Sequence, residues 1–415
     1  MKIAIPREIS DNETRVAISP DAIKKYSSFG LDVVVEAGAG WLSGMRDEDL
    51  TAAGATIAAN ADEVYDNADI ILKIKAPQQS EVQKIKEGAI VIASLNALTD
   101  SDAVNRLKDK KITAFAMELM PRITRAQSMD ILSSQSNLAG YKAVLDGAAE
   151  FGSAFPMMMT AAGTIPPAKV FIMGAGVAGL QAIATAKRLG AVVTAYDVRP
   201  ATKEQVESLG GKFVVVDEEA MKDAETSGGY AKEMSEEYKK KEQEVLQSHI
   251  AKQDMVITTA LIPGKKAPIL VKDEALQQMK PGAVLVDLAV EAGGNVEGAE
   301  AGKVVEKHGV KIVGHLNVAG RLPNDASALF AKNILNFVTP HIHEGKLEFD
   351  FEDETVTGTC VTKDGQIARE LPWHSLAEPA QQEEPAEEAA VKEEKPTITV
   401  KSKSTKEDKK EDANG

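Results

Sequence analysis

Residues 168–197 run AKVFIMGAGVAGLQAIATAKRLGAVVTAYD, and this stretch decides the fold of the segment around it. Residues 169–173 form an apolar run as long as a buried strand, and residues 180–189 have the periodicity of a helix that a glycine ends. A second apolar run at residues 191–196 ends in Asp197. The order of strand, glycine turn, helix, strand and acid predicts one unit of a parallel α/β sheet.

The sequence GAGVAG in this stretch matches the pattern G-x-G-x-x-G. In such a turn Gly174 permits the sharp bend, Gly176 lets backbone N–H groups approach a pyrophosphate, and Gly179 lets the helix pack on the strand. Asp197 follows about 20 residues later, where a carboxylate binds the hydroxyls of an adenosine ribose and repels a 2′-phosphate. Arg199, two residues later, slightly weakens the preference for ribose hydroxyls over a 2′-phosphate. The pattern therefore predicts a site for NAD rather than NADP, the alternative being an α/β unit whose turn binds no nucleotide.

Composition narrows the class of protein. The chain has 415 residues, of which 43% are hydrophobic, so it can bury more than one sizeable core. Its formal net charge of −15 argues against nucleic acid and anionic membrane as direct partners. The single cysteine, Cys360, leaves neither a disulfide nor a thiolate metal cluster, and we expect no metal site. Residues 1–3 run straight into a strand-like segment, so we expect no signal peptide. No uninterrupted apolar stretch of about 18–20 residues occurs, so we expect no membrane insertion.

Strand and helix signals also alternate before the glycine turn. Five short apolar runs precede it, at residues 2–5, 33–35, 70–74, 89–94 and 112–117. This alternation predicts two doubly wound, mostly parallel Rossmann-like α/β domains separated by a cleft. We expect residues 1–133 and 326–375 to form one domain, residues 134–325 the NAD-binding domain, and residues 376–415 a disordered, charged tail.

The polar segment at residues 121–141 lies between the two predicted domains. From composition it is either a surface loop with a helix cap or a loop of hydrogen-bonding groups beside a cofactor. A helix is expected to follow from about residue 134 to residue 151.

The segment at residues 217–254 is far longer than the crossover of a Rossmann fold requires. One interpretation is a decorated crossover helix. The other is a mobile lid, in which Gly229 belongs to a hinge and Tyr230 closes on the nucleotide.

Three local signals complete the prediction. Thr202 and Gln205 fit a capping box that starts a helix. Residues 212–216 are expected to form the third strand of the NAD-binding sheet. His315 follows another strand and is either a ligand or catalytic group or an ordinary hydrogen-bonded residue.

Several segments together resemble the alanine dehydrogenase/nicotinamide nucleotide transhydrogenase family. They are IPRE and NETRVAISP within residues 5–20, VEAGAG at 35–40, ILKIKAP at 71–77, the glycine turn, TTALIPGKKAP at 258–268 and DLAVEAGG at 287–294. The resemblance covers residues 1 to about 369.

The alanine dehydrogenase branch fits less well. Its acid/base histidine is expected where this chain has Asn96, and an asparagine cannot take a proton. Alanine dehydrogenases also have an aspartate just before a Gly-Gly pair, and in that region this chain has Glu291. Arg15 and Lys75 match the family pattern, so the resemblance leaves room for a vestigial substrate pocket.

The transhydrogenase branch fits better. PRITRAQSMDILSSQSNLAGY at residues 121–141 looks like the nicotinamide-contacting loop of that branch, and GGYAKEMS from residue 228 resembles its mobile loop. The resemblance implies catalytic roles for Arg122, Gln127, Asp130 and Ser133. The full set of cofactor-binding residues expected is Arg122, Gln127, Ser128, Met129, Asp130, Ser133, Gly174, Gly176, Val177, Gly179, Asp197, Val198, Arg199, Gly229, Tyr230, Thr259 and Ala260.

The resemblance implies direct hydride transfer between NADH, held by this chain, and NADP⁺, held by another. The expected partners are a second copy in a homodimer, an NADP(H)-binding beta subunit and a membrane subunit that forms the second portion of alpha. The chain would then be cytoplasmic, peripheral on the inner face of the bacterial membrane, and its reaction would be coupled to proton translocation by the partners. Two alternatives stay open: a soluble NAD-dependent alanine dehydrogenase and a non-catalytic NAD sensor.

Overall fold

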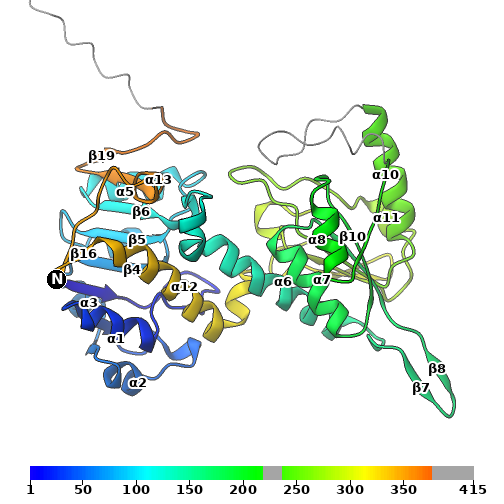
Figure 1. The fold of residues 1–415 in the computed structure, drawn as a ribbon, viewed down its shortest axis with the longest axis horizontal. Coiled ribbons are helices and arrows are strands. Elements are labelled where there is room, and N and C mark those ends of the chain that lie inside the picture. Colours follow the sequence, from blue (N-terminus) through cyan, green and yellow to red (C-terminus); the bar gives the residue numbers. More distant parts are fainter. Residues whose placement is uncertain (218–235, 376–415) are drawn as a thin grey trace, which may run out of the picture. The chain divides into compact units, whose positions relative to one another are not determined.

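Two separate β-sheets, each with mostly parallel strands, form the framework of the protein (Figure 1). The computed structural model describes residues 1–217 and 236–375. The predicted class, two mostly parallel α/β sheets, is confirmed. The predicted tail, Gly229 and Tyr230 lie outside the described residues, and the predicted domain limits stay a prediction.

The first sheet has eight strands, which come from both ends of the described chain. From edge to edge they are β19 (Gln366–Ile367), β18 (Cys360–Lys363), β6 (Thr113–Ala116), β5 (Ile90–Ser94), β4 (Ile70–Lys75), β1 (Lys2–Ile5), β2 (Asp32–Glu36) and β3 (Thr56–Ala58). Strands β1 to β6 pair in parallel, whereas β18 is antiparallel to both β6 and β19.

The second sheet has seven strands and contains the glycine turn. Its order is β11 (Lys212–Phe213), β10 (Val192–Tyr196), β9 (Lys169–Met173), β12 (Met255–Thr258), β13 (Val284–Asp287), β15 (Val310–Val313) and β14 (Val304–Lys307). Only the edge pair β14–β15 is antiparallel among these described strands. The strand order reverses direction at β9, so the turn after β9 lies where doubly wound folds bind ligands.

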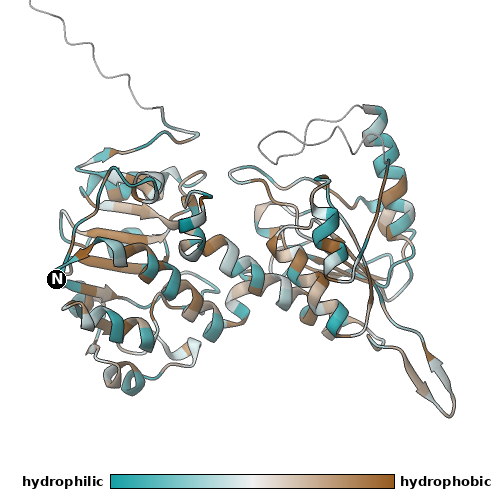
Figure 2. Cartoon of the chain, viewed as in Figure 1, coloured by the Kyte–Doolittle hydropathy of each residue, from teal (hydrophilic) through white to brown (hydrophobic). Residues whose placement is uncertain are grey.

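Side chains on both faces of each sheet are buried, which explains the unbroken apolar runs in the sequence; Figure 2 shows the hydropathy of the residues. On β1, Ile3 and Ile5 belong to one hydrophobic core and Ala4 to another. On β9, Val170 and Phe171 likewise face different cores. Successive side chains of a strand point to opposite faces of the sheet, so each strand contributes to the hydrophobic cores on both faces.

The helices lie between the strands in sequence. They are α1 (Pro20–Ser28), α2 (Asp47–Ala52), α3 (Ala61–Tyr65), α4 (Gln79–Val82), α5 (Ser101–Asp109), α6 (Ile131–Glu150), α7 (Val177–Arg188), α8 (Thr202–Ser208), α10 (Glu236–Ile250), α11 (Asp273–Leu276), α12 (Pro323–Val338) and α13 (Glu354–Thr359). Helix α1 shows the local logic: Ser19 accepts a hydrogen bond from the Ala22 N–H, and Pro20 occupies the first turn.

Helix α6 belongs to both halves of the structure. Ile131 packs in a core of the first sheet, whereas Ala143 and Val144 pack in a core of the second. Gly140 allows close contact with α7, because a Cβ there would stand 2.0 Å from the Ala178 carbonyl oxygen. A single helix is therefore fixed at one end to the first sheet and along its middle to α7.

Several local expectations were wrong. Helix α6 begins at Ile131 rather than near residue 134, because the Asp130 carboxylate caps it through the Ser133 N–H. Thr202 is the first helical residue of α8 rather than its cap, and no side chain caps that helix. Strand β11 covers only Lys212–Phe213. A hairpin of β7 (Met158–Thr160) and β8 (Gly163–Ile165) precedes β9 and was not predicted.

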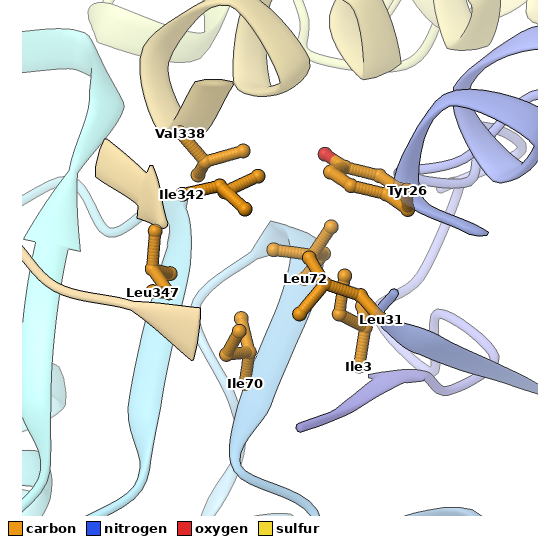
Figure 3. Close-up of a pocket in the computed structure, with 8 residues that line it drawn as sticks. All are labelled: Ile3, Tyr26, Leu31, Ile70, Leu72, Val338, Ile342 and Leu347. Carbon is orange, nitrogen blue, oxygen red and sulfur yellow. The ribbon is translucent and has the colours of Figure 1, made fainter. Parts of the chain in front are cut away.

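Tyr26 lines a small apolar cavity of about 10 Å³ in the first core (Figure 3). The other lining residues are aliphatic: Ile3, Leu31, Ile70, Leu72, Val338, Ile342 and Leu347. The Tyr26 hydroxyl is buried and has no hydrogen-bond partner among the described residues. Tyr65 is equally buried, with 1% of its surface exposed, but its hydroxyl donates to Glu81 at 2.8 Å.

These two tyrosines give a matched test of buried-hydroxyl energetics. Tyr26→Phe is expected to leave the free energy of unfolding unchanged or to raise it by up to about 1 kcal/mol, because it removes an unpaired polar group. Tyr65→Phe is expected to lower it by about 1–2 kcal/mol, since Glu81 loses a buried donor. Urea unfolding of both variants measures the difference. Equal destabilisation by the two changes would contradict the prediction.

Candidate functional site

The glycine turn joins β9 to α7, and its glycines have different reasons to be there. Gly174 has a φ of +103°, and a Cβ would stand 2.4 Å from the Thr259 hydroxyl oxygen. A Cβ on Gly179 would stand 1.8 Å from the Gly174 carbonyl oxygen. A Cβ on Gly176 would meet nothing within 4 Å, so packing inside the described chain does not require a glycine there. Close approach of a ligand to the backbone does require one.

Asp197 lies beside this turn at the end of β10. Its Oδ2 accepts a hydrogen bond from the Ala175 N–H at 2.7 Å, and its Oδ1 accepts from the Arg199 N–H at 2.9 Å. Burial alone would raise the pKa of this carboxyl, but the hydrogen bonds from Arg199 and Ala175 outweigh it and hold the pKa below its ordinary value. A buried carboxylate is therefore kept ionised at the position predicted for the ribose-binding acid.

The loop after β12 contacts the glycine turn through Thr259. The Thr259 hydroxyl donates to the Gly174 carbonyl oxygen at 3.1 Å. The amide of Asn295 brackets Ala260, since its Oδ1 accepts from the Ala260 N–H at 3.0 Å and its Nδ2 donates to the Ala260 carbonyl at 2.9 Å. The same Nδ2 donates to the Pro268 carbonyl at 2.8 Å. Asn295 thus fixes the backbone of Ala260, next to Thr259, in the predicted cofactor-binding loop.

Asn295 is itself held by Asp287, at the end of β13. The buried Asp287 carboxylate accepts from the N–H groups of Ala289, Asn295 and Val296 at 2.8–3.0 Å. Burial raises the pKa of Asp287, and the backbone donors oppose that rise. Sequence reasoning missed both Asp287 and Asn295 as parts of the site. The available signal was a polar residue directly after Gly293 and Gly294 in a glycine-rich loop.

The segment predicted to contact nicotinamide contains the 3₁₀ helix η3 (Thr124–Met129) and the start of α6. Asp130 accepts from the Ser133 N–H at 3.0 Å and from the Ser133 hydroxyl at 2.5 Å, so the structure brings these two residues together. Arg122 and Gln127 are exposed, and Val198 is exposed beside Asp197 in the other predicted group.

This segment is anchored by its neighbours in the fold. Met129 is buried in the first core, and the Ser128 carbonyl accepts from the side-chain amides of Asn333 and Asn336 at 2.9 Å each. Arg125 forms a bidentate pair with Asp353 at 2.7 Å. Exposed side chains such as Gln127 therefore stand on a fixed backbone.

The structure gathers the predicted residues into two groups. One surrounds the glycine turn and Asp197, and the other lies between Arg122 and Ser133. Within residues 1–217 and 236–375, no hydrogen bond joins the groups directly, and α6 connects them. Gly229 and Tyr230 cannot be assigned to either group, because they lie outside the described residues.

The positions that match an amino-acid dehydrogenase are arranged differently. Asn96 has a φ of +53°, in a loop whose Leu95 and Ala97 N–H groups donate to the partly buried Glu118 carboxylate. The Arg15 guanidinium is engaged by Glu13, with a shortest distance of 2.7 Å, and by Gln135 at 2.8 Å.

Lys75 is half-buried at the end of β4, and the Glu291 carboxylate accepts from the Asn317 N–H at 3.2 Å. The loop at Asn96 offers no titrating group in its own sequence, SLNALT. These contacts do not build an acid/base site for an amino acid.

His315 acquires no clear chemical role. Partial burial lowers its pKa, and the nearby Arg321 lowers it further, which favours the neutral ring. Arg321 is itself held by Asp146 at 3.1 Å. A ligand or catalytic role for His315 stays a prediction that these contacts do not support.

Among residues 1–217 and 236–375, no group of three or more His, Cys, Asp and Glu side chains is placed to hold a metal ion. In the same stretches of the chain, no helix is both long and apolar enough to cross a bilayer.

Comparison with known proteins gives consistent matches over most of the chain. The family profile described as "Alanine dehydrogenase/PNT, N-terminal domain" matches residues 4–139, and "Alanine dehydrogenase/PNT, C-terminal domain" matches residues 143–370. The chain is 62% identical over 374 residues to the first portion of the NAD(P) transhydrogenase alpha subunit of Rhodospirillum rubrum, covering 88% of this chain and 97% of that protein.

Two further matches cover both branches. The crystal structure of transhydrogenase from Sinorhizobium meliloti is 53% identical, with a TM-score of 0.80 over 88% of this chain and 100% of that chain. An alanine dehydrogenase of Methanococcus maripaludis is 30% identical over 378 residues, covering 89% of this chain and 95% of that protein.

The bracket around Ala260 yields a stability prediction. Asn295→Ala removes the three hydrogen bonds of a buried side chain and leaves backbone groups of Ala260 and Pro268 unpaired, so the free energy of unfolding is expected to fall by about 3 kcal/mol. Asn324→Ala, at an exposed position in α12, is the matched control and should change it by less than about 0.5 kcal/mol. Urea unfolding measures the free energy of unfolding of both variants. Similar losses in the two would contradict the role of Asn295 in holding the Ala260 backbone.

Proposed function

The chain belongs to the alanine dehydrogenase/PNT family, and from that premise we propose that it is the NAD(H)-binding component of a proton-translocating nicotinamide nucleotide transhydrogenase. The observation that carries the proposal is the pairing of an intact glycine turn with Asn96. The glycine turn fits a dinucleotide. Asn96 stands where an amino-acid dehydrogenase would have its acid/base histidine, and an asparagine side chain cannot take up a proton.

The geometry of the turn fits NAD(H). Gly176 leaves open space at the start of α7, where backbone N–H groups and the helix N-terminus favour a pyrophosphate. The ionised Asp197 favours ribose hydroxyls over a 2′-phosphate. Thr259 and Ala260 present a fixed backbone on the opposite side of the turn.

The proposed reaction is direct transfer of a hydride from NADH on this chain to NADP⁺ on a partner. Bound NADH supplies the hydride, and the chain supplies orientation and exclusion of water. Asp130 and Ser133, fixed to one another at the start of α6, would orient the nicotinamide carboxamide and its ribose. Gln127 is exposed on a rigid backbone and would reach toward the second nucleotide, and Arg122 would anchor the loop or the dinucleotide.

The proposed partners follow from relatives that are named as the first portion of a divided alpha subunit. They are a second copy of this chain, an NADP(H)-binding beta subunit and a membrane subunit that forms the second portion of alpha. The chain would lie in the cytoplasm on the inner face of the bacterial membrane, and the partners would couple hydride transfer to proton translocation.

The decisive experiment mixes the purified chain with membranes that carry the beta subunit and the second portion of alpha. Transfer of reducing equivalents from NADH to an NADP⁺ analogue should depend on adding this chain. NADH oxidation by the chain alone with pyruvate and ammonia would instead support the alternative, an alanine dehydrogenase.

Gln127 provides a sharper test of the hydride-transfer step. Gln127→Asn shortens the side chain by one methylene, so NADH affinity should stay nearly unchanged, while turnover in the reconstituted complex should fall by about 100-fold or more through lost alignment. The exposed Gln278 offers the matched control, Gln278→Asn, with unchanged turnover expected. Steady-state rates and NADH titration check both; unchanged turnover of the Gln127 variant would remove this role.

The hairpin of β7 and β8 provides a test of the homodimer. Its strands are exposed throughout, and Met159 is 79% exposed. A two-stranded hairpin with apolar exposed side chains is marginal alone and is stabilised by a partner surface.

Met159→Asp is therefore expected to weaken self-association by on the order of tenfold or more. Trp41→Asp, at another exposed apolar position, is the control and should leave the oligomeric state unchanged. Analytical ultracentrifugation over a range of concentrations measures both. Loss of the dimer in the Trp41 variant alone would place the interface elsewhere.

A further inference from the structure

The Asp197 carboxylate is fully occupied by donors from its own chain. Besides the N–H groups of Ala175 and Arg199, it accepts from the Arg199 side chain, with Nε at 2.9 Å from Oδ1 and Nη2 at 2.8 Å from Oδ2. Each oxygen therefore has two donors. An ionised carboxylate offers about four lone-pair positions, so a ribose hydroxyl needs one of these donors to leave.

The four donors are not equally replaceable. The Ala175 N–H belongs to the glycine turn between β9 and α7. The Arg199 N–H lies two residues after Asp197, just beyond the end of β10. Both donors are therefore fixed by the backbone. The guanidinium is at the end of a long side chain that is 36% exposed, against 5% for Asp197. The guanidinium is thus the partner on the solvent side and the one that can move away.

We propose that the Arg199 guanidinium and the adenosine ribose of NAD(H) compete for the same two acceptor positions on Asp197, which makes Arg199 a specificity-determining residue. The inference rests on the proposed function, because it takes the ligand to be a dinucleotide. For NAD(H), the ribose hydroxyls replace the guanidinium, so Arg199 lowers affinity. For NADP(H), the 2′-phosphate accepts from the released guanidinium, so Arg199 lessens the repulsion by Asp197.

Two substitutions separate competition from general damage. Arg199→Ala removes both the competitor and the phosphate partner. The dissociation constant for NADH should fall by about threefold, as expected for a partly exposed ion pair, and that for NADPH should rise by roughly tenfold. Arg199→Lys keeps the charge but loses the bidentate fork, so NADH should again bind more tightly while NADPH stays within about threefold of the native chain.

The control is Arg188→Ala. Arg188 is exposed in the last turn of α7, at the end of the helix away from the glycine turn, so its removal changes net charge equally without touching Asp197. Both dissociation constants should then stay near the native values. Isothermal titration of the full-length chains with NADH and with NADPH measures them, and thermal unfolding confirms that each variant is folded.

The outcomes distinguish this inference from the proposed function. If the native chain binds no NADH, the proposed function fails. If the native chain binds NADH but the folded Arg199→Ala and Arg199→Lys variants bind it equally or more weakly, competition is overturned and Arg199 supports the bound cofactor instead. Tighter NADH binding in both variants, with weaker NADPH binding in Arg199→Ala alone, supports the inference.

Discussion

The packing of α6 into two hydrophobic cores is the constraint on which the rest of the site depends. Asp130 caps the helix where it leaves the first core, and Gly140 places the helix against α7, whose first turn follows the glycine turn. About ten residues of helix separate these two points, a rise of about 15 Å. Helix α6 therefore links the predicted nicotinamide-contacting segment to the helix that follows the glycine turn.

Three aspartates organise the loops around that helix in the same way. Asp130, Asp197 and Asp287 each lie at or next to the end of a helix or strand, and each carboxylate accepts at least one hydrogen bond from a backbone N–H group of a nearby loop or turn. Such charge-assisted bonds are stronger than those between neutral groups. The backbone is thereby set in place before any ligand contributes, and exposed residues such as Gln127 need only provide a side chain.

The sequence permitted prediction of the elements whose cause is local. The glycine turn, the strand before it and Asp197 lie within the single stretch 168–197, and their spacing alone indicates the unit. The bracket made by Asn295 was not predictable in this way, because its partner Ala260 lies 35 residues away. The segment at Arg122–Ser133 shows the intermediate case: family resemblance suggested its role, but only the structure shows that Asp130 is bonded to Ser133.

Strand β18, which follows the second sheet in the sequence, has a consequence for the order in which the chain can fold. It pairs with β6 through Cys360 and Phe115, so the first sheet takes residues from both sides of the second in sequence. All strands of the second sheet lie between residues 169 and 313. During synthesis from the N-terminus, all strands of the second sheet are therefore made before β18 and β19, which complete one edge of the first sheet.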